Sequence, residues 1–335
     1  MSDAPVFLTG ATGFLGGEIV RQLVAGGREV HALARATSDK SALEGLPVHW
    51  HDGDLNQPAS LEAALGGLAG RAPEVIHSAA VISYKEGGGP LQERVNVEGT
   101  RALLAAALHH GAGRCVHISS VVAVGVAPGP EGVLDEDAPW NGARLGDYAR
   151  TKRAAEEAAL SFARDDLDLC VVNPGAIFGP QAPHSNTTRF VEGVHQRRFG
   201  PFAPPGSLAV VGVEDVARGV LLALERGQRG RRYLLTHESL RLFEVLTAVA
   251  GVLGVRGPSI TVRPALWGVL VGAVRAWNKV RVSEELTPQA LHLLGSHFRF
   301  DASRARQELG WTPAPFVEVV ESTVEWMRAS GRLPG

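Results

Sequence analysis

Cysteine is scarce in this chain, with two among 335 residues. Cys115 and Cys170 each lie inside an apolar run, "RCVHIS" and "DLCVVN". Domains that depend on disulfides use many more cysteines, and isolated apolar thiols are typical of a reducing compartment. The sequence therefore predicts two buried free thiols and a cytoplasmic protein. The start, "MSDAPVFLTG", has no basic region followed by an apolar core, so we expect no export.

An excess of charge of one sign is also lacking. The 33 Lys and Arg residues nearly balance the 35 Asp and Glu residues, which gives a net charge of −2. Binding to nucleic acid depends on clustered positive charge, and no long basic run occurs here. We therefore expect no nucleic-acid partner and a small-molecule substrate instead.

No apolar run is long enough for a transmembrane helix, which needs about 20 residues. The most apolar late stretch, residues 264–277, is interrupted by Arg275. Two interpretations of this predicted helix stay open. It is either a buried helix, or one that makes peripheral contact with a membrane or lines an apolar substrate cavity.

Metal-site patterns are missing despite twelve histidines. His49 and His51 alternate on a predicted strand, and His109 and His110 end a predicted helix. No cysteine joins them and no HExxH pattern occurs, so the sequence predicts no metal site.

What the first half of the chain does contain is an alternation of β-rich and helical segments. The predicted strands are 5–10, 29–35, 47–55, 74–80, 114–120 and 167–175, and the predicted helices are 16–25, 60–68, 90–110 and 148–164. Strands that alternate with helices indicate parallel βαβ units. The sequence therefore predicts an α/β fold with a doubly wound parallel sheet.

The pattern changes near residue 180, where Pro- and Gly-rich loops begin. Further helices are predicted at 213–225, 242–253, 264–277, 287–294, 302–309 and 316–327. We expect a nucleotide-binding domain over residues 1–180 and a smaller, mainly helical substrate-binding region over 181–335. Some strands and helices of the second part are expected to return to the first.

The first predicted strand leads directly into "TGATGFLG", residues 9–16, with glycines spaced GxxGxxG. A tight turn between a strand and a helix lets the backbone approach a pyrophosphate and directs a helix N-terminus at its charge. The sequence therefore predicts a dinucleotide site. The residues expected to contact the cofactor here are Gly10, Thr12, Gly13, Phe14, Leu15 and Gly16.

The residue that reads the adenosine ribose is expected about 20 residues further on, where an acid favours NAD. Arg35 occupies this place, and the nearest downstream acid is Asp39. A guanidinium group binds phosphate with two hydrogen bonds, so Arg35 favours NADP(H). NAD(H) stays open, because an arginine stacked on adenine accepts either cofactor.

Two further strand ends fit the same site. Asp54 and Leu55 end the third predicted strand, where a carboxylate can accept from the adenine amino group. Ala79 and Ala80 end the fourth, where small side chains let the backbone approach the ribose and phosphates.

The stretch "YARTK" places Tyr148 and Lys152 four positions apart, on one face of a predicted helix. Alone, this is an ordinary exposed pair. Together with the stretches "TGATGFLG", "GDL", "HSAA", "NVEGT", "ISS", "NPGAIFGP" and "ARQELGWTP", it resembles the extended short-chain dehydrogenase/reductase superfamily over nearly the whole chain. The resemblance is greatest to its dihydroflavonol 4-reductase-like and 3β-hydroxysteroid dehydrogenase-like branch, part of the NAD(P)-dependent epimerase/dehydratase family.

The resemblance implies a Rossmann-type fold and roles for four residues. Tyr148 would exchange a proton with the substrate oxygen, and Lys152 would lower the pKa of Tyr148 and bind the nicotinamide ribose. Ser120, preferred over its neighbour Ser119, would hydrogen-bond the same substrate oxygen. Asn96 would hold the polar network behind Lys152.

Pro174 would end the sixth strand beside the cofactor, and the backbone at Ala176 and Ile177 would meet the nicotinamide carboxamide. Phe178 would contact the substrate. Tyr84, in the loop "AVISYKEGGG", is a further candidate substrate contact, with an exposed loop tyrosine as the alternative. The resemblance also implies a homodimer through helices 90–110 and 148–164.

The same apparatus supports several reactions. Dehydratases of the family carry an acid pair where this chain has Val121 and Val122, which argues against dehydration. Arg189, Arg197 and Arg198 would suit the diphosphate of a nucleotide-sugar epimerase. The second half is rich in apolar side chains, which favours reduction of a ketone or aldehyde on a fairly apolar molecule, or the reverse oxidation. A regulator that binds NADP without turnover is the remaining alternative.

Overall fold

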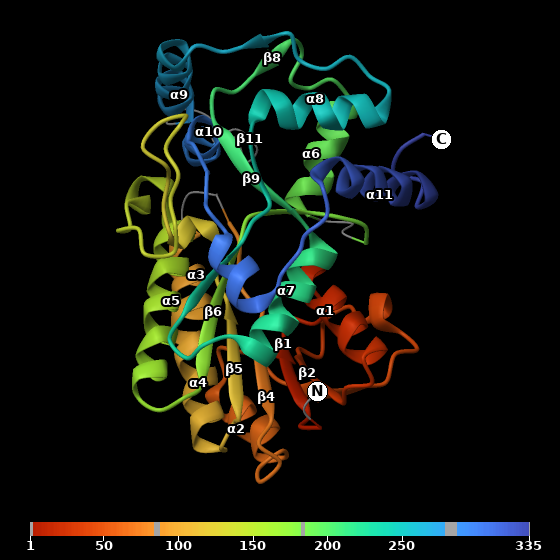
Figure 1. Cartoon of the computed structure of the whole chain (residues 1–335), viewed down its shortest axis with the longest axis vertical. Helices are drawn as coiled ribbons and strands as arrows, with labels where there is room; N and C mark the ends of the chain where they lie inside the picture. Colours follow the sequence, from red (N-terminus) through yellow and green to blue (C-terminus); the bar gives the residue numbers. More distant parts are fainter. Residues whose placement is uncertain (1–2, 84–87, 182–184, 279–286, 335) are drawn as a thin grey trace.

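The computed structural model describes residues 3–83, 88–181, 185–278 and 287–334. Figure 1 shows a parallel sheet flanked by helices in its lower part, with a smaller group of helices and short strands above. The smaller group comes mostly from the second half of the chain. The predicted α/β class is confirmed.

The central sheet has seven strands in the order β10-β6-β5-β4-β1-β2-β3, and all neighbouring pairs are parallel. The order reverses between β1 and β4, and ligands bind at such a switch point in doubly wound sheets. Six strands match predicted ones, and the seventh returns from the second half. Their bounds are β1 Val6–Thr9, β2 Val30–Ala34, β3 Val48–Asp52, β4 Glu74–His77, β5 Arg114–Ile118, β6 Leu169–Pro174 and β10 Arg232–Leu235.

Helices cover both faces of this sheet, because alternate residues of each strand point to opposite sides. Val6 and Leu8 of β1 pack in one core with helices α1 (Phe14–Ala25) and α7 (Val213–Arg226). Phe7, between them, packs in a second core on the other face. That core includes side chains of the helices α2 (Pro58–Gly66), α4 (Gly99–His109) and α5 (Asp147–Arg164). Cys115 and Cys170 are buried and free, as predicted.

The single helix predicted over residues 90–110 is interrupted. A short helix α3, Gly89–Gln92, continues into a π-helical turn, Glu93–Glu98, before α4 begins. Such turns are rare and occur often at functional sites. Asn96 lies inside this turn.

The upper region has its own core, which Phe178, Val210, Val245 and Phe316 share. Strand β9 pairs with β7 and β11, and β8 pairs with β12. The bounds of these strands are β7 Ala176–Phe178, β8 Phe202–Ala203, β9 Ser207–Gly212, β11 Glu238–Arg241 and β12 Ile260–Thr261. The helices are α6 Asn186–His195, α8 Leu242–Leu253, α9 Pro264–Asn278, α10 Pro288–Gly295 and α11 Phe316–Ala329, with a π-helical turn at Ala305–Leu309.

The predicted apolar helix is present as α9, but the interpretation that it is buried is wrong. Leu266, Val269 and Trp277 are exposed by 62%, 70% and 62%. Only a narrow stripe of the helix packs against the rest of the protein. Packing in a core therefore does not explain its apolar composition. Across the described ranges, no helix is long and apolar enough to cross a membrane.

Candidate active site

A cavity of about 410 Å³ lies where the carboxyl ends of β1, β4, β5 and β6 meet the upper region. Its size suits a small ligand. Of the lining residues that the structure describes, Lys152 alone carries a charge. The predicted site residues among them are Gly10, Gly13, Phe14, Leu15, Gly16, Ala80, Ser120, Tyr148, Lys152, Pro174, Ala176 and Ile177.

The glycine loop fits a bound phosphate. Gly10 has φ +80°, and a Cβ there would lie 2.7 Å from the backbone nitrogen of Ala79. A Cβ at Gly16 would overlap the carbonyl oxygen of Gly10. Gly13 caps α1 without a side-chain hydrogen bond, so the first N–H groups of the helix stay open toward the cavity. The loop thus offers backbone donors and a helix N-terminus, which is what a pyrophosphate requires.

The residues predicted for the adenosine half lie beside this loop but outside the cavity. Arg35 is exposed directly after β2, and Thr9 of β1 pairs with Leu33 of that strand. The carboxylate of Asp54 accepts hydrogen bonds of 2.9 Å from the backbone and side-chain amides of Asn56.

Three other predicted cofactor contacts also lie outside the cavity lining. Leu55 is buried in the core, and Thr12 is exposed at the loop tip. Ala79 donates its backbone N–H to the hydroxyl of Thr9 at 3.3 Å.

Tyr148 stands in the first turn of α5 and faces Ser120, the residue two places beyond the end of β5. The two side chains are hydrogen-bonded, whereas the hydroxyl of Ser119 is buried with no partner among the described residues. Ser120 is therefore the serine in contact with Tyr148, and its predicted contact with the substrate oxygen stays a prediction. Burial raises the pKa of Tyr148 to about 12, against the lowering effect of the hydrogen bond with Ser120.

Lys152 lies one turn further along α5 and donates a hydrogen bond of 2.8 Å to the carbonyl oxygen of Ile118. Burial lowers the pKa of Lys152 to about 8, and the charge of Glu156 opposes this shift. Removal of the phenol from water dominates the pKa of Tyr148 here, and the lowering effect predicted for the charge of Lys152 stays a prediction.

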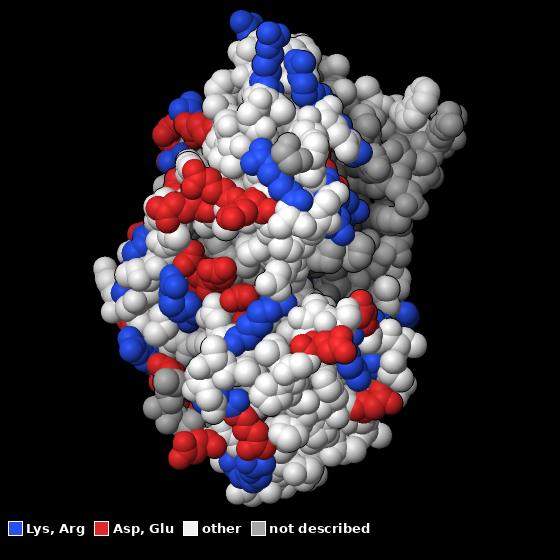
Figure 2. Space-filling view, turned by 90° about the vertical axis from the view of Figure 1, so that its right-hand side faces the viewer, with Lys and Arg blue, Asp and Glu red and all other residues white. Residues whose placement is uncertain are grey.

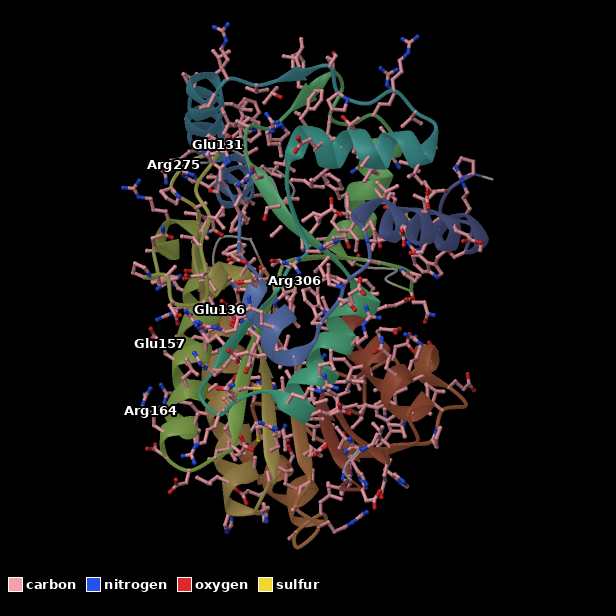
Figure 3. The ribbon with its side chains drawn as sticks, in the orientation of Figure 1. Glu131, Glu136, Glu157, Arg164, Arg275 and Arg306 are labelled. Carbon is pink, nitrogen blue, oxygen red and sulfur yellow. The ribbon has the colours of Figure 1, made fainter. Side chains whose placement is uncertain are left out.

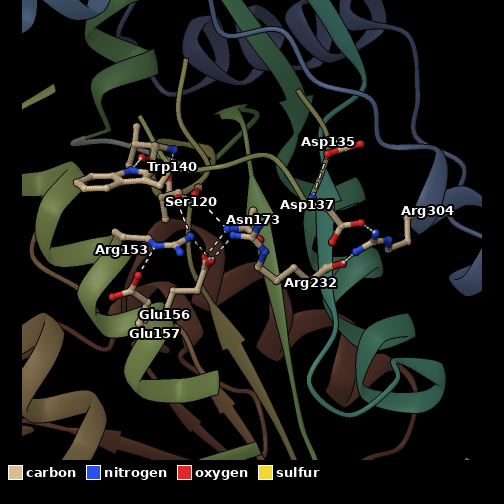
Figure 4. A network of polar contacts seen from close by, with 12 residues as sticks. Ser120, Asp135, Asp137, Trp140, Arg153, Glu156, Glu157, Asn173, Arg232 and Arg304 are labelled. Atoms are coloured by element: carbon tan, nitrogen blue, oxygen red, sulfur yellow. Dashed lines mark hydrogen bonds and ion pairs between the residues drawn. The ribbon is translucent and has the colours of Figure 1, made fainter. Parts of the chain in front are cut away.

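A buried polar network behind the cavity escaped prediction from the sequence (Figure 4). The side-chain amide of Asn173 donates to the carbonyl oxygen of Ser120 at 3.1 Å and to Glu156 at 2.6 Å. Arg232, on β10, donates to the same carboxylate at 2.8 Å. The network fixes the backbone of Ser120 and places an anion one helical turn from Lys152. Its signals in the sequence are weak, namely a polar residue ending an apolar run and an acid at i+4 from the lysine.

Asn96 fixes the loop after β4. Its side chain accepts from the backbone N–H of Val81 at 2.7 Å and donates to the carbonyl of Val81 at 3.0 Å. It also contacts the hydroxyl of Thr151 at 3.3 Å. Asn96 therefore touches the neighbour of Lys152, and its predicted role behind Lys152 stays a prediction.

Two further residues, Phe178 and Tyr84, were predicted to contact the substrate. Phe178 is 1% exposed and packs edge-on against Phe190 and Phe316, with ring centroids 6.1 and 5.1 Å apart. The prediction that it contacts substrate is wrong, because it points into the upper core. Tyr84 lies outside the described residues.

Several lining residues come from the second half of the chain, and no local motif marks them. They are Ser185, Asn186, Thr187, Leu208, Leu293 and Phe298. Val121 and Val122 also line the cavity, so the acid pair of a dehydratase is absent from these two positions.

Among the residues that the structure describes, two groups of His and Glu side chains lie close enough to share an ion, both away from the cavity lining. They are Glu29, His31 and His49, and Glu62, His109 and His110. Each is already held by hydrogen bonds: Arg71 donates twice to Glu29, and Glu62 accepts from both of its histidines. The carboxylates of both groups thus have hydrogen-bond partners within the protein, and the absence of a metal site stays a prediction.

Comparison with known proteins identifies the family to which this fold and this site belong. The profile of the NAD dependent epimerase/dehydratase family matches residues 6–235. The sterol demethylase protein B of Methylococcus capsulatus is 34% identical over 331 residues, 97% of this chain and 99% of the relative. The putative dihydroflavonol 4-reductase of Synechocystis is 34% identical over 336 residues, with 97% and 95% covered.

Among solved structures, the crystal structure of gox2253 superposes with a TM-score of 0.86 at 29% identity. The match covers 99% of this chain and 100% of that one. The glycine loop, the parallel sheet and the relatives that match over nearly the whole chain all indicate the same family. The chain is therefore an NAD(P)-dependent enzyme of the extended short-chain dehydrogenase/reductase superfamily, and it belongs to the NAD dependent epimerase/dehydratase family.

Proposed function

We propose that the protein reduces a ketone or aldehyde on a fairly apolar small molecule with NADPH, or catalyses the reverse oxidation. The observation that carries this proposal is the hydrogen-bonded pair of Ser120 and Tyr148 at the wall of the cavity. A hydroxyl and a phenol placed together can both donate to one carbonyl oxygen. Lys152 lies one turn away and adds a positive charge.

In this reaction Tyr148 donates its proton to the carbonyl oxygen as the carbon is reduced, and the product is an alcohol. A bound reduced nicotinamide supplies the hydride. Ser120 donates a hydrogen bond to the same oxygen, which stabilises the negative charge that develops there. Lys152 binds ribose hydroxyls and contributes its charge beside the phenol. With a pKa of about 12, Tyr148 stays protonated at neutral pH, as an acid must.

The lining of the cavity supports an apolar substrate. Ile82, Leu208, Leu293 and Phe298 face it, and Arg189, Arg197 and Arg198 are not among the described lining residues. A nucleotide sugar carries a diphosphate, which needs cationic partners. The name of the Methylococcus capsulatus relative refers to a sterol, and this also favours an apolar ligand.

The preference for NADP(H) rests on Arg35. The nearest downstream acid, Asp39, accepts a hydrogen bond of 2.9 Å from the backbone N–H of Ser41. That hydrogen bond lowers the pKa of Asp39, whose carboxylate is thus engaged locally. Arg35 remains an exposed guanidinium at the end of β2, where a 2′-phosphate would lie.

Replacing Arg35 by Ser is expected to raise the KM for NADPH about ten- to a hundredfold and to leave the KM for NADH nearly unchanged. This rise in KM corresponds to the binding free energy lost with the charged hydrogen bonds of one guanidinium group. Steady-state kinetics with each cofactor measure it. Lys40→Ser is the matched control, since the ammonium of Lys40 lies over the ring of Trp50 at 4.9 Å. An equal loss for both cofactors would show that Arg35 does not read the phosphate.

The kcat/KM for carbonyl reduction is expected to be constant below about pH 8 and to fall about tenfold for each pH unit above it. The pKa of Lys152 is lowered to about 8, so its positive charge is complete below this value and lost above it. Lys152→Arg keeps the charge at high pH and should remove the descending limb of the profile. A limb that persists in Lys152→Arg would assign the titration to another group.

The test of the function is cofactor consumption over a panel of apolar ketones, aldehydes and sterols, with NADPH and NADH in parallel. Oxidation of NADPH with at least one apolar carbonyl compound is the expected result. Interconversion of nucleotide sugars without net consumption of cofactor would identify an epimerase instead. Tight NADPH binding without turnover of either class would identify a regulator.

A further inference from the structure

We propose that helix α9, together with the β8–β12 ribbon beside it, docks on the surface of an anionic lipid membrane. The two elements are neighbours along the chain, because β12 ends at Thr261 and α9 begins at Pro264. We call this surface the α9 face and define it by its six exposed large apolar residues: Phe202, Ile260, Leu266, Val269, Leu270 and Trp277. The inference rests on side chains outside the cavity and does not depend on which substrate is reduced.

The exposure of the α9 face is exceptional for the protein. Leu266, Val269 and Trp277 are exposed by 62%, 70% and 62%, and Phe202 and Ile260 of the ribbon by 52% and 53%. Six of the eleven exposed large apolar residues of the described chain belong to this face. Exposed apolar side chains gathered on neighbouring segments are typical of docking sites.

The attachment of α9 explains why its outer side is free. Trp267, Val271 and Val274 are the half-buried apolar residues of the helix and form one stripe at helical spacing. The indole N–H of Trp267 donates to the carbonyl oxygen of Leu291 at 3.0 Å, which ties α9 to α10. Leu266, Val269 and Leu270 flank this stripe and are exposed.

The charge around the α9 face favours a lipid surface. Between Glu244 and Glu284 the sequence contains no acidic residue and five basic ones. Three of these, Arg256, Arg263 and Arg275, are described and exposed. Figure 3 places Arg275 at the outer edge of the molecule beside α9. Figure 2, which views the molecule from the side away from α9, shows further Lys and Arg side chains at its uppermost end. Cations around an apolar helix are what binding to anionic lipid requires.

The same charge argues against a second copy of the chain as the occupant. A symmetric dimer through this face would place basic residues of both copies, such as Arg263 and Arg275, at one interface, and α9 itself carries no acid to compensate. The described part of α9 does not cross a membrane by itself. Its 15 residues span about 22 Å, which is too short for a bilayer but enough to lie along its surface. Trp277, at the end of the helix, suits the headgroup region.

Only one element, α10, separates the docked helix from the cavity. α10 packs against α9 at Trp267, whose indole lies against Gly295, and α10 contributes Leu293 to the cavity lining. Docking would therefore hold this side of the cavity close to the membrane, where apolar small molecules concentrate.

The experiment is flotation of the full-length protein with vesicles of phosphatidylcholine alone and of phosphatidylcholine with phosphatidylglycerol in equal parts. We expect binding to the anionic vesicles, and weaker binding to the neutral ones. Val269→Asp is expected to lower the partition coefficient about tenfold or more, because a valine then leaves the apolar phase and a like charge enters. Arg263→Gln should reduce binding to the anionic vesicles only.

Val317→Asp is the matched control, since Val317 is 49% exposed on α11, away from the α9 face. It should bind vesicles as the wild type does. Equal binding by Val269→Asp and wild type, or binding to neither vesicle, would overturn the proposal. So would a dimer in solution that Val269→Asp dissociates, since a second copy would then cover the face. Vesicle binding is measured without substrate, so its outcome is separate from that of the proposed reaction.

Discussion

Tyr148→Phe is expected to lower kcat for carbonyl reduction about a thousandfold. The substitution removes the proton donor and keeps the buried ring, and general acid catalysis of this kind contributes roughly a hundred- to ten-thousandfold. The phenol is 8% exposed and hydrogen-bonded to Ser120, so water does not replace it easily. The rate of NADPH oxidation with the best substrate measures the effect. The dissociation constant of NADPH should change little, because the backbone of the glycine loop is untouched.

Tyr233→Phe is the matched control for this prediction. Its hydroxyl also makes hydrogen bonds, at 2.9 Å to Glu308 and to the backbone of Gln228, but none of these residues is among those lining the cavity. This variant should retain kcat even if its melting temperature falls. If Tyr148→Phe kept a tenth or more of the wild-type rate, the proton would have to come from another group.

Gly16→Ala is expected to weaken NADPH binding about ten- to a hundredfold, the second large effect. A Cβ at this position would overlap the carbonyl oxygen of Gly10, so the loop that approaches the phosphates must move. Overpacking of a tight site costs about 1–3 kcal/mol, which corresponds to this loss of affinity. Titration of the protein with NADPH by fluorescence measures the dissociation constant.

The control for this prediction is one residue further along α1. A Cβ at Gly17 meets its nearest neighbour, the carbonyl oxygen of Ala11, at 3.5 Å, which is ordinary van der Waals contact. Gly17→Ala should therefore bind NADPH as the wild type does. Similar losses in both variants would mean that general damage to α1, and not the approach to the phosphates, controls the affinity.

The parts of the site that follow from short local patterns could be predicted from the sequence. The glycine spacing fixes a turn between β1 and α1, and the i+4 spacing fixes Tyr148 and Lys152 on one face of α5. Ser120 follows a buried strand, so its place at the carboxyl edge of the sheet was also predictable. All of these positions are set by a few neighbouring residues, which is why local rules found them.

The rest depends on packing between distant segments. Phe178 follows Ile177, which lines the cavity, but neighbouring strand residues point to opposite sides, and the ring enters the upper core. Asn173 and Glu156 meet only after β6 and α5 have packed. The apolar composition of α9 suggested burial, whereas the fold leaves most of its surface uncovered. The raised pKa of Tyr148 likewise reflects how much of the fold surrounds it.

The path of the chain has a consequence for protein engineering. The upper region is not a segment inserted at one point, because α7 and β10 return to the sheet between β9 and β11. Ala305, Leu309 and Trp311 then pack with the sheet core before α11 joins the upper core. A chimera that exchanges the substrate region of this protein for that of a relative would need several junctions. A single junction after residue 180 would also exchange β10, so that a strand of the relative would have to pair with β6 of this chain and cover that edge of the sheet.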